Sequence, residues 1–276
     1  MKAVLAIASL AVPSALAAAP AKPLFVVCSP GSPGTTAEAQ PIMDLFAAAL
    51  SAKAGLPLAA VYDESEDAGV ARLRVKDAAV ALVSLPFYLK HERDLALRAR
   101  LQAVSKGRPE LEVWTLVAKK GRVATPAALD GFTLVSNAGF APAFVRGPAL
   151  GGYGPLPASV RVVASGNVLS ALRRAAAGEQ VAVLVDGTQQ AALASLPFAS
   201  ELEAVTQSQP LPAGVVAAVD GRLAPKTWSA VENALLALAS DESGARALDA
   251  LQTARFAPLD ERALTAARKA YADAAR

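Results

Sequence analysis

Short apolar runs alternate with amphipathic segments along most of this chain. The runs consist largely of Val, Leu and Ala, a composition typical of strands that are buried on both faces, as in parallel sheets. They occupy residues 23–29, 57–63, 78–84, 113–119, 131–137, 160–165, 180–186 and 214–220. Between them, the spacing of apolar residues predicts helices over 37–54 and 168–178. This alternation of strand and helix is typical of βαβ units and predicts an α/β fold.

The C-terminal part of the chain has a different pattern. From Pro225 onward, the sequence predicts helices only and no further strand. A first helix beginning at Pro225 carries an apolar stripe that includes Trp228 and Val231. The last helix is predicted to begin at the capping residue Asp260 and to turn Leu264 inward.

Two distant stretches, 74–87 and 177–190, share one pattern of a helix-like segment, an apolar run and a small polar residue. The polar residue that ends the run is Ser84 in the first stretch and Asp186 in the second. This repetition predicts two α/β lobes, each with its own central strand. In open α/β sheets, ligands bind outside the carboxyl ends of the strands. Two lobes that face each other would place both sets of strand ends around one cleft, which is a favoured site for a small molecule.

The N-terminal residues have the features of a secretory signal peptide. Lys2 precedes an apolar stretch from Ala3 to Val12, and small residues follow it up to position 21. The apolar stretch is too short to span a membrane, which takes about 20 apolar residues. We therefore expect residues 1–21 to be a signal peptide that directs the protein to the periplasm. Cys28 is the only cysteine, so an intrachain disulfide is excluded.

Composition and motifs argue against several classes of protein. The chain has 276 residues, of which 54% are hydrophobic and 18% charged, and its formal net charge is +3. Basic residues form no cluster longer than a pair, so we expect no nucleic-acid partner. His91, the only histidine, falls in a segment, 89–101, that resembles an exposed, charged helix. We therefore expect no zinc site, no Ser-His-Asp triad, no cofactor and no catalytic residue.

Four segments of the chain are similar in content and order to a known family. They are residues 77–91, 125–145, 169–188 and 207–261. The last of these contains a return strand, a helix of the type "ALLALA", a short helix and the motif "F-x-P-x-D". Together they resemble the substrate-binding proteins of phosphate, phosphite and phosphonate ABC transporters, within the type 2 periplasmic-binding-protein class.

The resemblance implies a two-lobed α/β fold with a mixed, mostly parallel sheet in each lobe and two crossing hinge strands. The crossings would fall near 104–120 and 204–220. Lobe 1 would then comprise residues 22–110 and 215–276, and lobe 2 would comprise residues 111–214.

The loop after the first strand, 28–41, offers hydroxyl groups and glycines in front of a helix. The first N–H groups of a helix have no partner within it and can bind an anion. This position indicates five candidate ligand-binding residues: Ser29, Gly31, Ser32, Thr35 and Thr36. A plain surface turn is the alternative interpretation of this loop.

Six further candidates come from the other strand ends and from the resemblance. Ser84 and Asp186 end the two central strands, although capping of the next helix is the commonest role of an Asp in such a position. The family often places an aromatic residue at the position of Tyr88, for which burial is the alternative. The remaining candidates are Ser136, which matches a Ser-rich loop of the family, its neighbour Asn137, and Asn167, which is expected to close the opposite rim with Asp186.

The function implied by the resemblance is capture rather than catalysis. We expect a monomeric periplasmic protein that binds a small anionic solute, similar to phosphonate or phosphate, and presents it to the membrane permease of an ABC importer. One alternative is an exported sensory or scaffold protein of the same fold that signals to a partner kinase. Another is an exported α/β enzyme that uses carboxylates such as those of 62–69.

Overall fold

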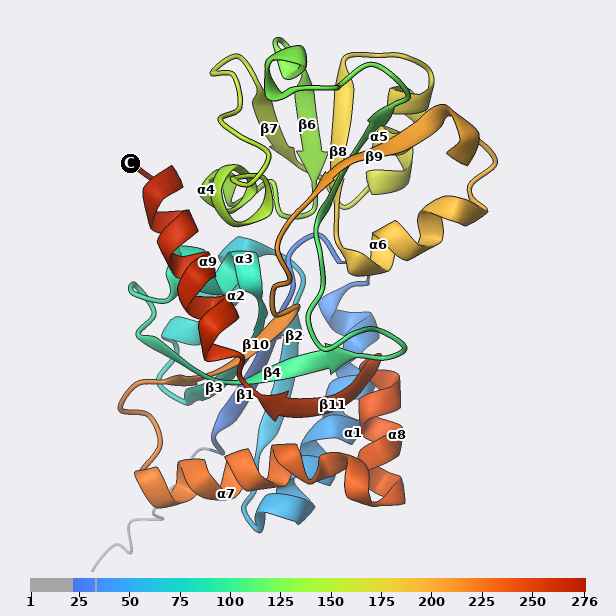
Figure 1. The fold of residues 1–276 in the computed structure, drawn as a ribbon. Helices are drawn as coiled ribbons and strands as arrows, with labels where there is room; N and C mark the ends of the chain where they lie inside the picture. Colours follow the sequence, from blue (N-terminus) through green and yellow to red (C-terminus); the bar gives the residue numbers. More distant parts are fainter. Residues whose placement is uncertain (1–21, 33) are drawn as a thin grey trace, which may run out of the picture.

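The computed structural model describes residues 22–32 and 34–276. The predicted signal peptide, residues 1–21, lies outside the described residues. Figure 1 shows two α/β lobes, one above the other. We call the lobe with the six-stranded sheet lobe 1 and the lobe with the five-stranded sheet lobe 2. The predicted α/β fold with two lobes and a mixed sheet in each is confirmed. The boundaries predicted at 110/111 and 214/215 stay a prediction.

The sheet of lobe 1 has the strand order β11-β4-β10-β3-β1-β2. Its strands are β1 (Leu24–Cys28), β2 (Ala59–Asp63), β3 (Ala78–Ser84), β4 (Leu97–Ser105), β10 (Gly214–Val219) and β11 (Thr253–Pro258). β1 is parallel to both β2 and β3, whereas β10 is antiparallel to β3 and β4, and β11 is antiparallel to β4. The sheet is thus less parallel than predicted, because β10 returns from lobe 2 and runs against both its neighbours.

The sheet of lobe 2 has the strand order β7-β6-β8-β5-β9. Its strands are β5 (Thr115–Lys119), β6 (Thr133–Ser136), β7 (Arg161–Ala164), β8 (Val181–Val185) and β9 (Leu202–Gln207). β6 is parallel to β7 and β8, and β5 is antiparallel to β8 and β9. The carboxyl ends of β6 and β8 therefore lie at one edge of this sheet.

Helices flank both sheets. In lobe 1 they are α1 (Thr36–Ala54), α2 (Glu66–Arg74), α3 (Leu85–His91), α7 (Pro225–Leu236) and α8 (Glu242–Ala250). Lobe 2 contains α4 (Pro142–Phe144) with the π-helical turn η2 (Val145–Ala149), α5 (Val168–Ala176) and α6 (Gly187–Ala192). Short 3₁₀ turns are η1 (Pro126–Leu129), η3 (Leu193–Ser195), η4 (Ala199–Glu201) and η5 (Leu238–Ser240). No helix among the described residues has the length and apolar character needed to cross a membrane.

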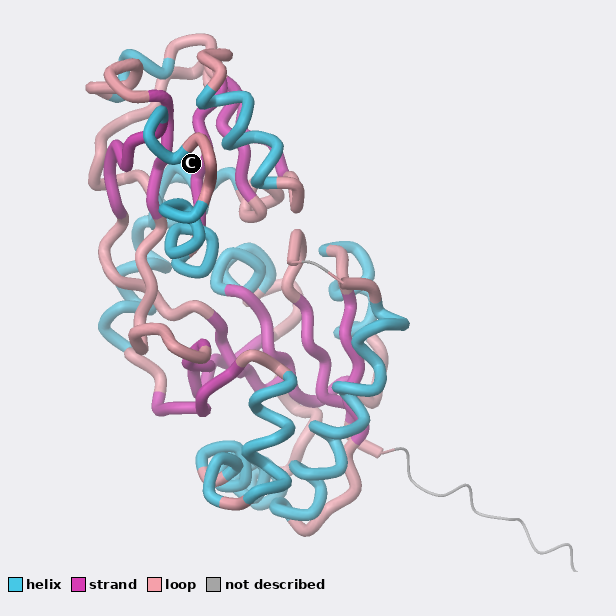
Figure 2. Tube along the Cα trace, turned by 90° about the vertical axis from the view of Figure 1, so that its right-hand side faces the viewer, coloured by secondary structure: helices cyan, strands magenta, loops and turns pink. Residues whose placement is uncertain are grey.

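Two crossing segments join the lobes on one side of the molecule (Figure 2). One runs from β4 to β5 and the other from β9 to β10. They pair through an isolated bridge in which Glu112 and Leu211 exchange two backbone hydrogen bonds of 2.8 Å. The backbone N–H of Trp114 also donates to Ser208 Oγ at 2.9 Å. The crossing strands that the resemblance implied are therefore held to each other as a pair.

The C-terminal helix α9 (Glu261–Ala274) contacts both lobes without being a chain crossing between them. It follows β11 of lobe 1 and runs alongside both lobes in Figure 1. It packs closely on η2 of lobe 2, because a Cβ atom on Gly147 would lie 2.2 Å from the carbonyl oxygen of Ala270. On the lobe 1 side, Arg268 Nε donates to Glu92 Oε2 at 2.8 Å.

One hydrophobic cluster spans the two lobes. It contains Phe87 and Tyr88 of α3, Trp114 of a crossing segment and Phe144 of lobe 2, all of them buried. The Trp114 and Phe144 rings meet edge to face at a centroid distance of 5.0 Å. A second cluster lies between the lobe 1 sheet and α1, α7 and α8, and a third lies under α5. The lobes are thus packed against each other next to the crossing segments.

Two predictions about secondary structure are wrong. The segment 89–101 is not one exposed helix, because α3 ends at His91 and β4 begins at Leu97. His91 is also not exposed, since its side chain is only 13% accessible and its Nε2 lies 2.6 Å from Glu66 Oε1. The C-terminal part contains a strand, β11, which pairs with β4 at the edge of the sheet. Paired strands on both sides of β4 thus override the helix-like sequence of that segment.

Candidate functional site

A cleft of about 570 Å³ lies between the lobes. Lobe 1 contributes the carboxyl ends of β1, β3 and β4, the start of β10 and the residues around the start of β11. Lobe 2 contributes the residues that follow β6 and β8, and the crossing segments contribute Glu112 and Trp114. The strand ends of both sheets therefore surround one cavity.

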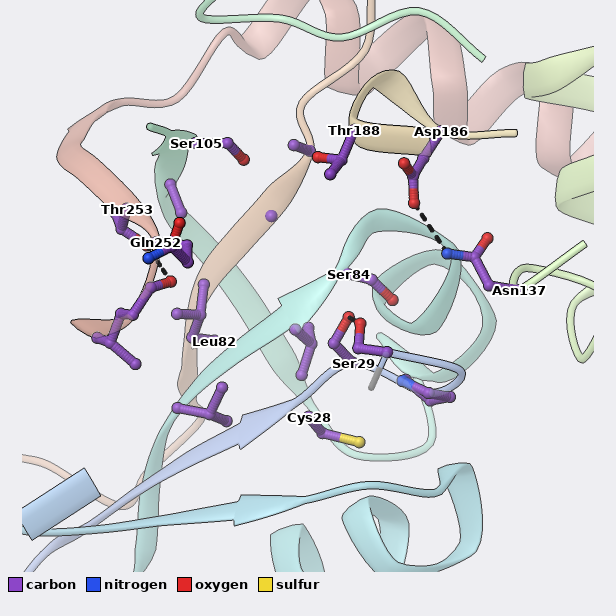
Figure 3. Close-up of a pocket in the computed structure, with 18 of the residues that line it drawn as sticks. Cys28, Ser29, Leu82, Ser84, Ser105, Asn137, Asp186, Thr188, Gln252 and Thr253 are labelled. Carbon is purple, nitrogen blue, oxygen red and sulfur yellow. Dashed lines mark hydrogen bonds between the residues drawn. The ribbon is translucent and has the colours of Figure 1, made fainter. Parts of the chain in front are cut away.

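Five of the predicted residues line this cleft: Ser29, Ser32, Ser84, Asn137 and Asp186. Figure 3 shows the Ser29 and Ser84 side chains near each other, with Asn137 and Asp186 on the same side of the cavity. Ser32 Oγ donates a 2.9 Å hydrogen bond to Ser29 Oγ, and Asn137 Nδ2 donates to Asp186 Oδ2 at 2.9 Å. Three of these five residues are serines, and we call the whole set the hydroxyl rim.

The other residues of the first loop have different surroundings. Thr35 and Thr36 do not line the cleft, because they begin α1, which places them outside it. The backbone N–H of Thr35 donates to Glu38 Oε2 at 2.9 Å, and that of Thr36 donates to Glu64 Oε2 at 2.8 Å. Carboxylates of the protein itself therefore already occupy the N-terminus of α1, where we had predicted an anion.

Gly31 brings the first loop against lobe 2. Its φ angle is +80°, which favours glycine, and a Cβ atom there would lie 2.9 Å from Cβ of Asn137. Gly166 of lobe 2 approaches the same position, since its own Cβ would lie 3.1 Å from the Gly31 carbonyl oxygen. Gly31 thus acts in the structure as a close contact between lobes.

Ser136 and Asn167 order local structure outside the cleft. Ser136 is fully buried, and its Oγ accepts the Ala138 N–H at 3.1 Å, which orders the turn after β6. Asn167 caps α5, with its Oδ1 accepting the Ser170 N–H at 3.2 Å. Neither residue lines the cleft.

Tyr88 lies away from the cleft and is fully buried in the core shared by the lobes. Its hydroxyl accepts the Ala99 N–H at 3.3 Å and a hydrogen bond from Arg268 Nη2 at 2.5 Å. The α3 helix begins directly after Ser84, so its rotation turns the fourth residue after the strand end into the core. The hydroxyl of Tyr88 is therefore engaged within the protein and does not reach a ligand in the cleft.

Sequence reasoning missed a second group of cleft residues. Thr188 comes from α6, and the others come from the crossing segments and the β4–β11 edge: Ser105, Lys106, Arg108, Glu112, Trp114, Gln252 and Thr253. None of them except Thr188 follows one of the predicted strands, so no strand-end signal indicates them.

Glu112 has unusual electrostatics. Burial and the neighbouring charge of Asp186 raise the pKa of Glu112 from 4.5 to about 8. Its Oε2 accepts the Gly187 N–H at 3.2 Å. At neutral pH the carboxyl group is therefore mostly protonated and can donate a hydrogen bond. Asp186 keeps its own partners, since Oδ1 accepts the Gln189 N–H at 2.8 Å and caps α6, as its position had suggested.

Two cleft residues have a buried polar atom without a hydrogen-bond partner in the described part of the chain. These atoms are Tyr62 Oη and Ser84 Oγ. A buried donor or acceptor without a partner costs about 1–3 kcal/mol, so such atoms are normally matched by a bound molecule or water. Both residues line the same cavity, so a polar molecule in the cleft would find unsatisfied hydrogen-bonding groups there. No group of His, Cys, Asp or Glu suited to a metal ion occurs within residues 22–32 and 34–276.

Comparisons with solved structures agree with this architecture. XAC2383 from Xanthomonas citri, bound to chloride, has a TM-score of 0.72 at 16% identity, covering 92% of this chain and 99% of that chain. A binding protein component of an ABC phosphonate transporter from Pseudomonas aeruginosa has a TM-score of 0.66 at 13% identity, covering 92% and 87%. PhnD1 from Prochlorococcus marinus, in complex with methylphosphonate, has a TM-score of 0.60 at 14% identity, covering 90% and 98%. At these identities the similarity establishes the fold.

No curated protein sequence matches the chain significantly. The sequence does match the model of one protein family, described as the periplasmic substrate-binding protein of phosphonate ABC transporters, over residues 32–264. This match covers most of the chain and includes every residue of the hydroxyl rim except Ser29. The chain therefore belongs to the family of phosphonate ABC-transporter periplasmic substrate-binding proteins.

Proposed function

We propose that this protein captures a small oxyanion of the phosphonate or phosphate class in the cleft between its lobes. It would work as a monomer in the periplasm, after export by its signal peptide, and would deliver the solute to the membrane permease of an ABC importer. Membership of the family supports this role, and a structural neighbour with the same fold binds methylphosphonate.

The observation that carries the proposal is the environment of Ser84. Its hydroxyl is buried at the end of β3, lines the cleft and has no partner among the described residues. The Ser29 and Ser32 hydroxyls lie on the same rim, joined by a hydrogen bond of 2.9 Å. Hydroxyl groups can turn their hydrogens toward an oxyanion, and hydrogen bonds to a charged group are about twice as strong as those between neutral groups.

The rim also explains how binding would favour closure of the lobes. Ser84 belongs to lobe 1 and Asn137 to lobe 2, and both line the same cavity. A ligand that contacts both residues gains its full set of hydrogen bonds only when the lobes are close together, so its binding free energy favours that state. The crossing segments, paired at Glu112 and Leu211, are the element about which the lobes would move.

Isothermal titration calorimetry with phosphate, phosphite and methylphosphonate tests the proposal. We expect at least one of them to bind, and Ser84→Ala to weaken it by about 1.5–3 kcal/mol, which is roughly a 10- to 150-fold rise in Kd. Ser170→Ala is the matched control, because this exposed serine on α5 lies outside the cleft. Failure of all three anions to bind, or equal effects of the two substitutions, would overturn the proposal.

A further inference from the structure

The cleft extends well beyond the hydroxyl rim along the sheet of lobe 1. Ser84, Gly214 and Ala103 are paired in register across β3, β10 and β4, and all three line the cleft. Neighbouring strands lie about 4.8 Å apart, so this row runs roughly 10 Å from Ser84 to Ala103. Because its residues are so small, the row forms the floor of a trough that leads away from the rim.

Polar residues gather again at the far end of this trough. Ser105 is paired with Thr253 across β4 and β11, and both line the cleft together with Gln252 and Arg108. Figure 3 shows Ser105, Gln252 and Thr253 on the opposite side of the cavity from Asn137 and Asp186, with Leu82 below Gln252 and with Ser84 and Thr188 between the two groups. The cleft thus has polar groups at both ends, and Leu82 supplies an apolar surface beside the far one.

The two ends of the cleft differ in the charged residues that line them. Lys106 lines the far end but is already paired with Asp249. Arg108 is half-buried, and its guanidinium makes neither an ion pair nor a hydrogen bond within residues 22–32 and 34–276. The acidic residues of the cleft are Asp186, which is held by Asn137 and the α6 N-terminus, and Glu112 beside it, which is mostly protonated at neutral pH.

A guanidinium in a partly buried position is best matched by a planar or tetrahedral oxyanion, which can accept two parallel hydrogen bonds. The rim already provides donors for one such group, and the trough from Ser84 to Ala103 is much longer than a one-carbon phosphonate. A ligand that fills the cleft therefore has room for a chain over Leu82 and for a second charged group near Arg108.

We propose that the cleft selects an elongated, doubly anionic ligand, with a phosphonate or phosphate head at the hydroxyl rim and a second anionic group at Arg108. This inference rests on the proposed function, because the head group is the one assigned there. Arg108 would determine the specificity for the second group, and the small residues Gly214 and Ala103 would leave room for the chain between them.

Calorimetry with two matched ligands tests the inference. Butylphosphonate offers the head and an apolar chain, and phosphonobutyrate carries a carboxylate in place of the terminal methyl group. We expect phosphonobutyrate to bind about 10- to 100-fold more tightly than butylphosphonate, as one charge-assisted contact provides. Arg108→Gln should abolish this ratio by weakening phosphonobutyrate far more than butylphosphonate. Arg74→Gln, an exposed arginine at the end of α2, should preserve the ratio.

The possible results separate the two proposals. If neither phosphonate nor phosphate binds, the proposed function fails. If butylphosphonate binds but the carboxylate adds nothing, or if its advantage persists in Arg108→Gln, only the second anionic subsite is overturned. An aminobutylphosphonate arm completes the series, because tighter binding of the ammonium compound than of the carboxylate compound would point to Glu112 and Asp186 instead of Arg108 and would also overturn the inference.

Discussion

Replacing Glu112 by Gln should make the protein more stable at alkaline pH. Burial and the charge of Asp186 raise the pKa of Glu112 from 4.5 to about 8. The folded protein therefore retains a proton at neutral pH that the unfolded chain releases. Gln is neutral at every pH and nearly isosteric with Glu, and its side-chain oxygen can still accept the Gly187 N–H that Glu112 accepts at 3.2 Å. The substitution thus removes the ionisation and keeps the packing.

The expected magnitude follows from linkage between protonation and folding. Below pH 4.5 the Glu112 carboxyl is protonated in both states, and between 4.5 and about 8 only the unfolded chain ionises. The free energy of unfolding therefore falls as pH rises through this window, by about 1.4 kcal/mol per pH unit. The full shift corresponds to about 5 kcal/mol, and the part between pH 6 and pH 9 to about 3 kcal/mol. For a protein of this size, 3 kcal/mol changes Tm by roughly 6–12 °C.

Thermal melts followed by circular dichroism at pH 6 and pH 9 provide the measurement. We expect Tm of Glu112→Gln to exceed that of the wild type by an amount that grows between the two pH values. Glu110→Gln is the control, because Glu110 is exposed and paired with Arg255 at 2.9 Å, two residues before Glu112. It should shift Tm by a small amount that does not depend on pH. If Glu112→Gln follows the same pH dependence as the wild type, Glu112 ionises normally and its assigned role as a hydrogen-bond donor is refuted.

Two further substitutions probe packing and capping, both by urea denaturation. Gly147→Ala should cost about 1–3 kcal/mol of stability, because the new Cβ would meet the Ala270 carbonyl oxygen of α9, whereas Gly152→Ala, with no heavy atom within 4 Å, should cost much less. Equal costs would show that α9 does not pack tightly on lobe 2. Thr35→Ala should cost about 1 kcal/mol through the lost capping box with Glu38. It should leave ligand affinity unchanged, and weaker binding would show that the α1 N-terminus contacts the ligand after all.

The buried strands were the most predictable part of the fold. β3 and β8 are continuous apolar runs, and nearly all of their residues are buried. A strand of this kind can be predicted without knowing its neighbours, because both of its faces are buried and its sequence is apolar throughout. Helix ends with strong local signals were also predictable, since Asp260 caps α9 and Gly55 ends α1 in the left-handed conformation.

The missed strands have sequences whose conformation depends on their partners. β4 begins with Leu97 buried and both Arg98 and Arg100 exposed, a short alternation that also fits a charged helix. β11 is an edge strand that ends at Pro258, where a proline is tolerated because one side of the strand has no neighbour. Their pairing with each other decides their conformation, and the sequence does not contain this information locally.

The residues of the candidate site also fall into a predictable group and an unpredictable group. Ser29, Ser84 and Asp186 line the cleft, as expected from their positions at the ends of strands. Whether they bind a ligand stays a prediction. Arg108 and Glu112 lie on a crossing segment without regular structure, so their place in the cleft depends on how the two lobes are joined. A local pattern could not indicate this.

If the cleft opens to admit a ligand, as the proposed function requires, the contacts between the lobes predict at which edge it would open. Next to the crossing segments, Phe87 and Trp114 are buried in one shared core, and Lys90 Nζ donates to the Phe140 carbonyl oxygen at 2.7 Å. Separation of this side would expose aromatic surface, and each large side chain contributes about 1.5–3 kcal/mol through burial. The loop of Gly31 meets Asn137 only by close packing, and no hydrogen bond joins them among the described residues. Opening at the Gly31 edge therefore costs far less than opening at the shared core, and a solute that holds Ser84 and Asn137 together can offset that small cost.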